Sequence, residues 1–511
     1  MSAVNLTSRL IGRPLGNKQK WLYRGVLLPV VAFVFFVVFC FNVSPFANEM
    51  SNDSSFFRMV GRGIMEGYMP YRDFFDMKGP YLFLIQYLGA AMSIGRWGFF
   101  FVEWLNFYVV LLLIDHLHQK GAGNQLYFPG NMILLLPYLW WFAGYFQGGN
   151  VCEEYCLIPL LICTTLAIRY IEQQCTSPRH LPIYAFVYGI SVGYIALIRI
   201  NDTLWIAAIV LFVFVNLLRQ KAFCNLAANF FAGLAGIVVG ALPAVIFCAT
   251  NGILDDMLYQ TFVFGFAYAQ ESGLIPKIYY FCLSAIVVPV AISYLLGEKR
   301  YRSLCWIGMF VMLIQLLMGN GYEHYLVSLA PYLVLGSYLC ARAGAGLVGQ
   351  KIRLSCGGQA GVRLLLCIAV TCVTFCFGAQ EVGYSGVHAV YQLLNPNYEG
   401  RTHLLHKIIP NDEVTDVYLY DDCSASQWYY YTNTYPRIRY CDWQSHYIEL
   451  DSRIADEIQA MFDTNPPKWL LLRAKGPDAD AKPDPFMESI VDRQYELYTT
   501  EADIAIYRLM K

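Results

Sequence analysis

The stretch NDSSFFRMVGRGIMEGYMPYRDFFDMKGPY, residues 52–81, is charged and glycine-rich, and it directly follows a long apolar run. The chain around it is strongly apolar. Of its 511 residues 57% are hydrophobic and 14% are charged, and the mean hydropathy is +0.42. This composition is typical of a membrane protein. So many titratable groups at one place in an apolar chain require a physical reason.

The charge and cysteine content exclude several classes of protein. The formal net charge of −1 shows no basic bias, so nothing favours nucleic acid as a partner. Most of the 16 cysteines lie inside apolar runs without CxxC or Cys/His metal spacing, which is typical of small buried hydrophobic residues. Cys423 and Cys441 lie in a polar tail and are candidates for a disulfide if that tail is extracytoplasmic.

The first apolar run, residues 25–43, follows a basic leader and resembles the start of a secretory signal. It is longer than a usual signal core, and no small-x-small cleavage pattern follows. We therefore expect an uncleaved first membrane span.

The distribution of basic residues sets the predicted topology. Apolar runs begin near residues 25, 79, 97, 129, 154, 181, 203, 226, 278, 303, 323 and 362. The run at residues 79–95 is short and is broken by glycines and Gln86. If it does not cross the membrane, the basic joints all fall on the side of the basic N-terminus, as the positive-inside rule requires. These joints contain Lys120, Arg179, Arg219, Lys221, Lys299, Arg300, Arg302, Lys351 and Arg353. The sequence therefore predicts about 11 spans, with residues 79–95 forming a helix at the outer interface.

In this topology residues 44–96 form one long extracytoplasmic loop, which we expect to carry the chemistry. The other polar joints on the same face are residues 148–155, 199–202, 251–277 and 319–325. Polar groups are thus predicted to gather on the outer face.

From about residue 383 the pattern changes to shorter apolar runs and a higher charge density. Residues 413–420, 438–443, 468–474 and 503–510 are typical of strands, and residues 403–409 and 451–462 of helices. We therefore expect a polytopic α-helical membrane domain over residues 1–382 and a small extracytoplasmic α/β domain over residues 383–511.

Within the outer loop, residues 54–67 have apolar side chains at helical spacing, and residues 70–80 combine cations and aspartates between two prolines. Cations there suit a phosphate at the membrane surface, and a nearby carboxylate suits removal of a proton from a hydroxyl. The alternative is an interfacial helix whose arginines contact lipid headgroups. The candidates for phosphate binding are Arg58, Arg72 and Lys78, and those for substrate binding are Asp73 and Asp76.

Three other outer joints add candidates. Asn150, a candidate for substrate binding, and Glu153 and Glu154, candidates for catalysis, stand at the mouth of a span. Paired carboxylates are costly there unless hydrated or partnered, and a solvated helix start is the alternative. Arg199, a further candidate for binding the donor phosphate, lies with Asp202 in a tight hairpin, where a snorkelling arginine is the alternative. At the third joint, Tyr322 and His324 are candidates for substrate binding, whereas an interfacial histidine is the simpler interpretation.

Several motifs that mark other functional classes of protein are missing from the sequence. The sequence has no GxxxxGK[ST], GxSxG or HExxH motif, which disfavours a nucleotide-driven pump, a hydrolase elbow and a zincin. Charges in the middle of the apolar runs are nearly missing, whereas ion-coupled transporters usually keep titratable groups near the midplane.

An aspartate in the first outer loop, an interfacial helix and then YRDFFDMKGP resemble the GT-C class of polyprenyl-phosphate-sugar-dependent glycosyltransferases. The similarity covers roughly residues 20–380 and is greatest to bacterial relatives of protein O-mannosyltransferases and aminoarabinose transferases. It implies Asp53 as the catalytic base, Lys78 and Pro80 at the lipid phosphate, and Glu153 and Glu154 as the next acidic position. The chain has Asn-Asp where the class has an acidic pair, and Lys-Gly-Pro where the class has Lys-Pro-Pro.

The resemblance implies transfer of a hexosyl or pentosyl group from a polyprenyl-phosphate donor to a glycan, lipid or protein acceptor of the cell envelope. The enzyme is then expected in the cell (inner) membrane, with its N-terminus cytoplasmic and its C-terminal domain extracytoplasmic. Metal dependence stays open, because a divalent cation assists some members of the class and not others. Two alternatives also stay open: a lipid-linked-saccharide transporter or flippase, and a polysaccharide polymerase or ligase.

Overall fold

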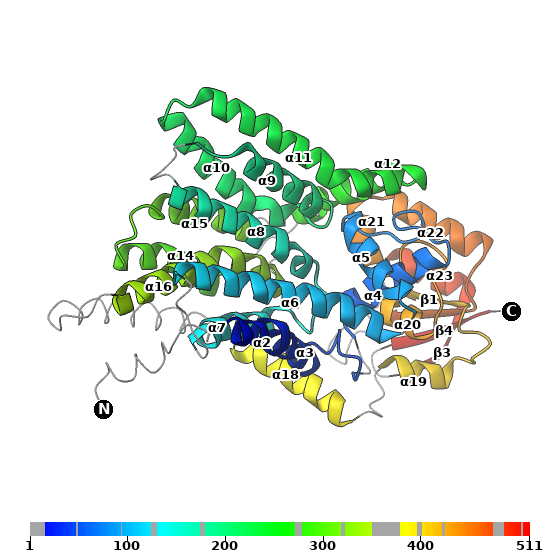
Figure 1. The fold of residues 1–511 in the computed structure, drawn as a ribbon. Coiled ribbons are helices and arrows are strands. Elements are labelled where there is room, and N and C mark those ends of the chain that lie inside the picture. The colour runs from blue at the N-terminus through cyan, green and yellow to red at the C-terminus, as the bar shows by residue number, and fades with distance from the viewer. Residues whose placement is uncertain are drawn as a thin grey trace. The chain divides into compact units, whose positions relative to one another are not determined.

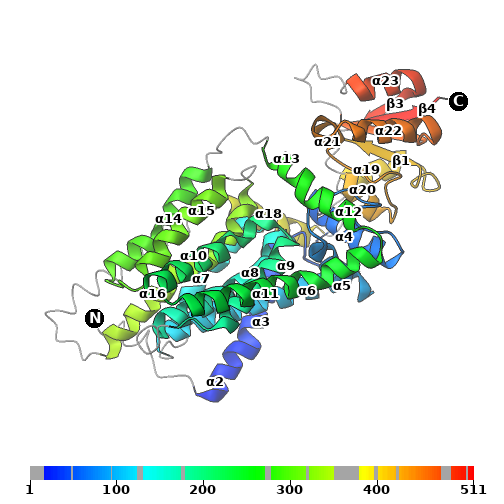
Figure 2. The same cartoon turned by 90° about the horizontal axis from the view of Figure 1, so that it is seen from above.

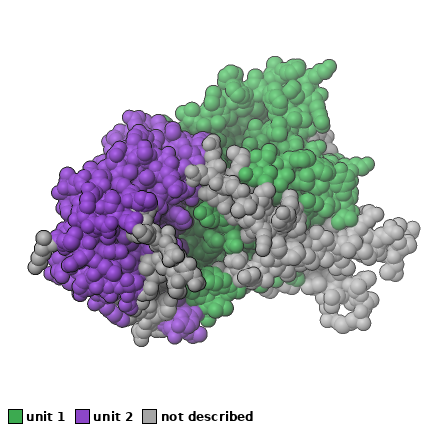
Figure 3. All heavy atoms as spheres, turned by 180° about the vertical axis from the view of Figure 1, so that it is seen from behind, with its two compact units in different colours: residues 1–44, 100–245, 271–390 green, residues 45–99, 246–270, 391–511 purple. Residues whose placement is uncertain are grey.

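The computed structural model describes residues 16–47, 50–93, 95–123, 130–173, 179–270, 278–317, 322–349, 379–395, 401–421, 425–473, 485–501 and 504–510. The chain divides into two compact units, which Figure 3 colours separately. Unit 1 comprises residues 1–44, 100–245 and 271–390, and unit 2 comprises residues 45–99, 246–270 and 391–511. The predicted boundary at residues 382 and 383 lies inside a helix, Ala379–Leu394.

Unit 1 is a bundle of helices (Figure 1). Its helical elements are α2 (Asn17–Leu22), η1 (Tyr23–Leu27), α3 (Leu28–Phe39), α6 (Arg96–Gly121), α7 (Gly130–Tyr145), α8 (Cys152–Gln173), α9 (Pro182–Ala196), η2 (Ile200–Thr203), α10 (Leu204–Arg219), α11 (Phe223–Thr250), α14 (Ile278–Leu295), α15 (Arg302–Leu317), η4 (Glu323–Leu329), α16 (Ala330–Gly349) and α18 (Ala379–Leu394). Leucine, valine, isoleucine and phenylalanine dominate these helices, and many of them stay exposed on the outer surface of the bundle. An apolar outer surface is what a lipid environment stabilises.

The helices agree with the predicted spans. Among the described residues six helices are long and apolar enough to cross a membrane, and four shorter apolar helices accompany them. These ten helices correspond to ten of the eleven predicted spans, and the eleventh, near residue 362, lies outside the described residues. The chain is therefore a multi-pass α-helical membrane protein.

Glycines allow two helices of unit 1 to approach closely. A Cβ atom on Gly189 of α9 would lie 2.0 Å from the carbonyl oxygen of Gly233, and one on Gly236 of α11 would lie 2.1 Å from the carbonyl oxygen of Phe186. Backbone contact through small residues is a common way to pack helices in membranes. It places α9 against α11 over more than one turn.

Unit 2 contains the predicted outer loop, whose two helices are α4 (Asn52–Met65) and α5 (Pro80–Ala91). Ser51 caps α4, and Pro80 stands at the first position of α5, where a missing N–H costs nothing. A Cβ atom on Gly61 of α4 would come within 2.6 Å of the backbone of Gln86 in α5, so the two helices are in backbone contact. With 12 residues, α5 is too short to span a bilayer, as predicted for residues 79–95.

The C-terminal part of unit 2 is a mixed α/β fold. Its strands are β1 (Val417–Tyr420), β2 (Trp469–Arg473), β3 (Tyr495–Glu501) and β4 (Ile504–Leu509), in the order β1-β2-β4-β3. β1 is parallel to β2, and the other two pairs are antiparallel. The remaining helical elements of unit 2 are α12 (Leu254–Leu258), η3 (Tyr259–Phe264), α13 (Gly265–Gln270), α19 (Arg401–Ile408), α20 (Ala425–Tyr431), α21 (Gln444–Leu450), α22 (Arg453–Thr464) and α23 (Pro485–Gln494).

Alternate residues of the sheet form the core of this α/β fold. Tyr418 and Leu470 pack with Ile458 of α22 and Ile490 of α23 in one buried cluster. Figure 2 shows α22 and α23 beside the strands. The same cluster includes Phe75 of the outer loop, so the loop and the C-terminal region share a core.

One sequence prediction for this region is wrong, and one strand was missed. Residues 438–443 form no strand, because Tyr440 and Cys441 are buried in a loop whose backbone carbonyl at Arg439 accepts a hydrogen bond from the amide of Phe75. The strand β3 was not predicted, because as an edge strand it exposes most of its side chains and lacks an apolar alternation. Cys423 lies outside the described residues, so a disulfide with the buried Cys441 stays a prediction.

Candidate functional site

Asp53, the predicted base, is exposed in the first turn of α4. The Ser51 hydroxyl accepts a hydrogen bond from the amide of Ser54 at 3.4 Å, which fixes the start of the helix. The positive end of the helix dipole stabilises a carboxylate at this position. Asp53 is therefore an ionisable group on a defined helix end that solvent can reach.

The loop that carries Asp76 and Lys78 is held by backbone and side-chain hydrogen bonds. Asp76 accepts from the amide of Lys78 at 2.6 Å, and the Tyr71 hydroxyl donates to the carbonyl of Lys78 at 2.8 Å. Gln260 accepts from the amide of Asp76 and donates to the carbonyl of Tyr71. Tyr71 has a backbone φ of 68°, an uncommon value for a bulky residue that persists because its surroundings fix it.

The charges of this loop influence one another. Burial raises the pKa of Asp76, the neighbouring Lys78 ammonium lowers it, and Asp53 raises it again. Asp76 is therefore within electrostatic range of both Lys78 and Asp53. The structure thus brings together three of the residues that the sequence selected.

The two arginines that the outer loop supplies to the predicted phosphate site differ in their surroundings. Arg58 is fully buried in α4, and its guanidinium lies 4.8 Å from the centre of the Phe99 ring. Arg72 is exposed and forms a 2.8 Å ion pair with Asp73, whose carboxylate also accepts from the amide of Met69 at 2.7 Å. Arg72 is thus the more accessible of the two arginines.

Sequence reasoning missed a group of polar residues beside Asp53. The side chain of Asn52 donates to Asp442 at 2.7 Å and accepts from the Ser426 hydroxyl at 2.7 Å. The pKa of Asp442 is raised to about 7, and burial is the main cause. The hydrogen bond from Asn52 lowers this pKa, whereas the charges of Asp53 and Asp76 raise it. No local pattern could reveal this contact, because 390 positions separate Asn52 from Asp442.

Unit 1 holds a second charged cluster around Glu153, which is fully buried at the start of α8. Arg199 forms an ion pair with Glu153 and lies 3.5 Å from the centre of the Tyr325 ring. His324 Nε2 lies 4.0 Å from the same Glu153 carboxylate. A buried carboxylate is tolerable there because a cation and a histidine accompany it.

Other members of this cluster surround the ion pair. Asp202 is buried, lies 3.9 Å from Arg199 and accepts a hydrogen bond from Gln315 at 3.2 Å. Gln147 is hydrogen-bonded to His324 at 2.8 Å and donates to Glu323 at 3.4 Å. The predicted residues Glu153, Arg199 and His324 are therefore in one network.

The remaining candidates of unit 1 lie near this network. Asn150 is buried with a φ of 61° and accepts from the Tyr155 hydroxyl at 2.9 Å, and Glu154 accepts from the amide of Val151 at 3.2 Å. Tyr322 is exposed, and its ring stacks on His324 with a centroid distance of 5.6 Å. Asn150 and Glu154 are thus enclosed, whereas Tyr322 is accessible.

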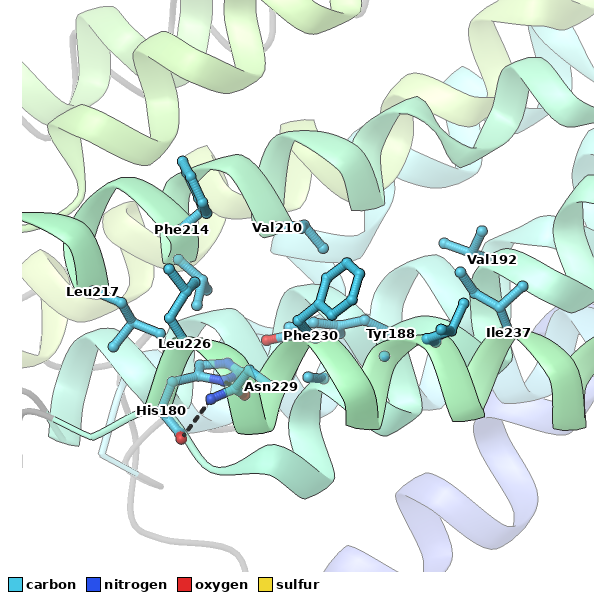
Figure 4. A pocket seen from close by; sticks show the side chains of 15 residues that line it. His180, Tyr188, Val192, Val210, Phe214, Leu217, Leu226, Asn229, Phe230 and Ile237 are labelled. Carbon is cyan, nitrogen blue, oxygen red and sulfur yellow. Dashed lines mark hydrogen bonds between the residues drawn. The ribbon is translucent and has the colours of Figure 1, made fainter. Parts of the chain in front are cut away.

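Metal binding and apolar pockets are questions separate from the two charged clusters. In the part of the chain that the structure describes, no group of three or more His, Cys, Asp or Glu side chains could hold a metal ion. A mainly apolar pocket of about 250 Å³ lies between α9, α10 and α11 (Figure 4). Its polar end is formed by His180 and Asn229, and it contains none of the predicted site residues. Its lining suits a hydrocarbon chain, whereas charged chemistry belongs to the two clusters above.

Comparison with known proteins identifies the fold. No protein-family model and no curated protein sequence matches the chain. The structure of ArnT from Cupriavidus metallidurans bound to undecaprenyl phosphate is similar, with a TM-score of 0.55, 11% sequence identity, and coverage of 95% of this chain and 98% of ArnT. The apo structure of the same ArnT gives a TM-score of 0.56, 12% identity, and coverage of 96% and 98%. ArnT is a glycosyltransferase of the GT-C class, so the predicted GT-C-type membrane fold with a small C-terminal sheet domain is confirmed.

We expect Arg199→Ala to destabilise the protein strongly, because it leaves the carboxylates of Glu153 and Asp202 without their cation. Breaking a buried ion pair on one side typically costs about 3–5 kcal/mol. Thermal unfolding in detergent measures the loss, and the double variant Glu153→Gln/Arg199→Ala should recover part of it. Arg169→Ala, at an exposed position of α8, is the matched control and should unfold like the wild type. Wild-type stability of Arg199→Ala would contradict the importance of the pair.

The pKa of Asp442 predicts a pH dependence of stability. Between its ordinary pKa of 3.8 and about 7, the folded protein holds a proton that the unfolded chain releases. The contribution of this group to the free energy of unfolding is therefore fully present below about pH 4, and it is lost as the pH rises to about 7. Asp442→Asn should flatten the decrease in melting temperature between pH 5 and pH 8, while the exposed-site variant Asp456→Asn should keep the wild-type slope. Equal slopes for Asp442→Asn and wild type would show that this carboxyl titrates normally.

Proposed function

We propose that the chain is an integral-membrane glycosyltransferase that moves a sugar from a polyprenyl-phosphate donor to a cell-envelope acceptor at the outer face of the membrane. The observation that carries the proposal is the position of Asp53, an exposed carboxylate at the start of α4 whose charge acts on Asp76 in the loop that also carries Lys78, in a chain with the fold of ArnT. Undecaprenyl phosphate, the ligand bound in one of the ArnT structures, indicates the class of donor.

The proposed reaction uses the residues of the outer loop. Asp53 accepts the proton of the acceptor hydroxyl as its oxygen bonds to the anomeric carbon of the sugar. The bond from that carbon to the phosphate oxygen breaks, and polyprenyl phosphate leaves with the electron pair. Lys78, with Arg72 as a second accessible cation, stabilises the charge on the leaving phosphate.

The other predicted residues have supporting roles in this proposal. Arg58 is enclosed in α4, so its contribution to the phosphate is through the field of its charge or through a rearranged side chain. Arg199 already pairs with Glu153, which favours a role in holding the outer ends of α8 and α10 in place. Glu153 and Glu154 are the next candidates for the base.

Purified protein supplied with radiolabelled polyprenyl-phosphate sugars and envelope extracts tests the activity. Movement of the label from the lipid donor to an acceptor supports a transferase. Movement of intact donor across proteoliposomes without transfer would indicate a flippase, and growth of long glycan products would indicate a polymerase or ligase.

We expect Asp53→Asn to lower turnover by about a hundredfold or more while donor binding survives, because the substitution keeps size and hydrogen bonding but removes basicity. Lys78→Ala should instead weaken donor binding by about 1.5–3 kcal/mol, the value of a charge-assisted hydrogen bond. Turnover and donor affinity are measured separately. The exposed controls Asp456→Asn and Lys299→Ala should behave like the wild type. Wild-type turnover by Asp53→Asn would exclude Asp53 as the base.

The proposed topology predicts the behaviour of reporter fusions. Alkaline phosphatase fused after Lys511 should be active, because the C-terminal domain is placed outside by the positive-inside rule. Green fluorescent protein fused after Gln220, in a joint with Arg219 and Lys221, should fluoresce because that joint is placed in the cytoplasm. The reverse pattern would overturn the orientation.

A further inference from the structure

The start of α4 is held by side chains from the C-terminal part of unit 2. Both ends of the Asn52 amide are engaged: its nitrogen donates to Asp442, and its oxygen accepts from Ser426 at 2.7 Å. Asn52 and Asp53 are the first two residues of α4. Fixing the Asn52 side chain therefore limits how the turn that carries Asp53 can rotate.

Further contacts extend this hold along α4. Gln427, next to Ser426 in α20, donates to the carbonyl of Met50 at 2.6 Å, just before the helix begins. At the other end Arg62 donates to the carbonyls of Tyr429 and Tyr430 at 3.2 and 3.0 Å, near the C-terminus of α20. A cation at the end of a helix stabilises its last carbonyls. Thus α20 runs beside α4 and is bonded to it at both ends.

The backbone next to Asp442 adopts an unusual conformation. Trp443 has a φ of 53°, in the left-handed region that side chains with a Cβ atom rarely enter, and half of its surface is exposed. Such a conformation persists only where surrounding contacts fix it. Gln444 supplies one of them, because it is buried and donates to the carbonyls of Leu419 and Tyr440.

We propose that Asp442 and Ser426 are positioning residues for the transferase reaction: they hold Asn52 and thereby set the direction in which the neighbouring Asp53 carboxylate faces. The inference rests on the proposed function of Asp53. It assigns part of the catalytic geometry to the C-terminal region, which the sequence treats as a separate domain.

The proposal requires a hydrogen-bond acceptor at position 442 and a hydroxyl donor at position 426. Asp442→Asn keeps an acceptor oxygen for Asn52, and Ser426→Thr keeps the hydroxyl. Asp442→Ala and Ser426→Ala remove them. Ser426→Ala deletes one oxygen and no carbon, so it tests the contact without leaving a large cavity in the fold.

The first measurement is steady-state transfer from undecaprenyl-phosphate sugars that carry ¹⁴C in the sugar, with the full-length protein in detergent. Asp442→Ala and Ser426→Ala should lower kcat about ten- to a hundredfold, because a base displaced by a fraction of an ångström to 1 Å loses alignment. The KM for the donor should stay close to wild type, since Lys78 is untouched. Asp442→Asn and Ser426→Thr should recover most of kcat. Ser452→Ala, at an exposed serine, is the matched control.

The second measurement needs no substrate. Hydrogen exchange followed by mass spectrometry should show faster exchange of residues 50–58 in the two alanine variants, and wild-type exchange in Asp442→Asn, Ser426→Thr and Ser452→Ala. Unchanged exchange in both alanine variants would overturn the proposal, and so would faster exchange with unchanged kcat. Wild-type transfer by Asp53→Asn, or no transfer from any donor by the wild type, would instead overturn the proposed function, and exchange would still decide whether the contact positions the helix.

Discussion

The proposed base Asp53 depends on the hydrogen bonds that hold the start of α4. A carboxylate at a helix end acts as a base only if the helix itself is fixed, because rate falls steeply with misplacement. Here the fixing groups come from α20 and from the loop before α21, nearly four hundred positions later in the chain. Phe75 of the outer loop packs in the same buried cluster as the sheet. The outer loop and the C-terminal region are therefore one folding unit.

A different constraint shapes unit 1. Its helices are apolar, so a charge at their ends must find partners within the protein or contact water. Glu153 meets this requirement through Arg199, whose guanidinium also lies over the Tyr325 ring. Residues 147–150 all have positive φ angles, and Asn42 holds this turn by donating to the carbonyls of Gln147 and Gly149. The turn before α8 is thus held by side-chain hydrogen bonds in addition to its own backbone conformation.

The likeness to ArnT illustrates how little sequence a membrane fold requires. Identities of 11–12% accompany coverage of almost both whole chains. An apolar helix of suitable length can be built from many combinations of leucine, valine, isoleucine and phenylalanine, so the fold persists while the residues change. A shared fold does not assign a function, so the roles of the polar groups are argued from local geometry.

By itself, the sequence determined the membrane class, the order of the spans and the non-crossing helix at residues 80–91, because hydropathy and the placement of Lys and Arg are local signals that the bilayer enforces. It also placed Asp53, Asp76 and Lys78 in one charged loop. Tertiary structure alone decided that Arg58 is buried, that Arg199 pairs with Glu153, and that Asp442 reaches Asn52. It also turned residues 438–443 from an expected strand into a loop, because packing of Tyr440 against Phe75 outweighs a local β preference. Contacts between distant segments leave no periodicity in the sequence, so only the folded chain reveals them.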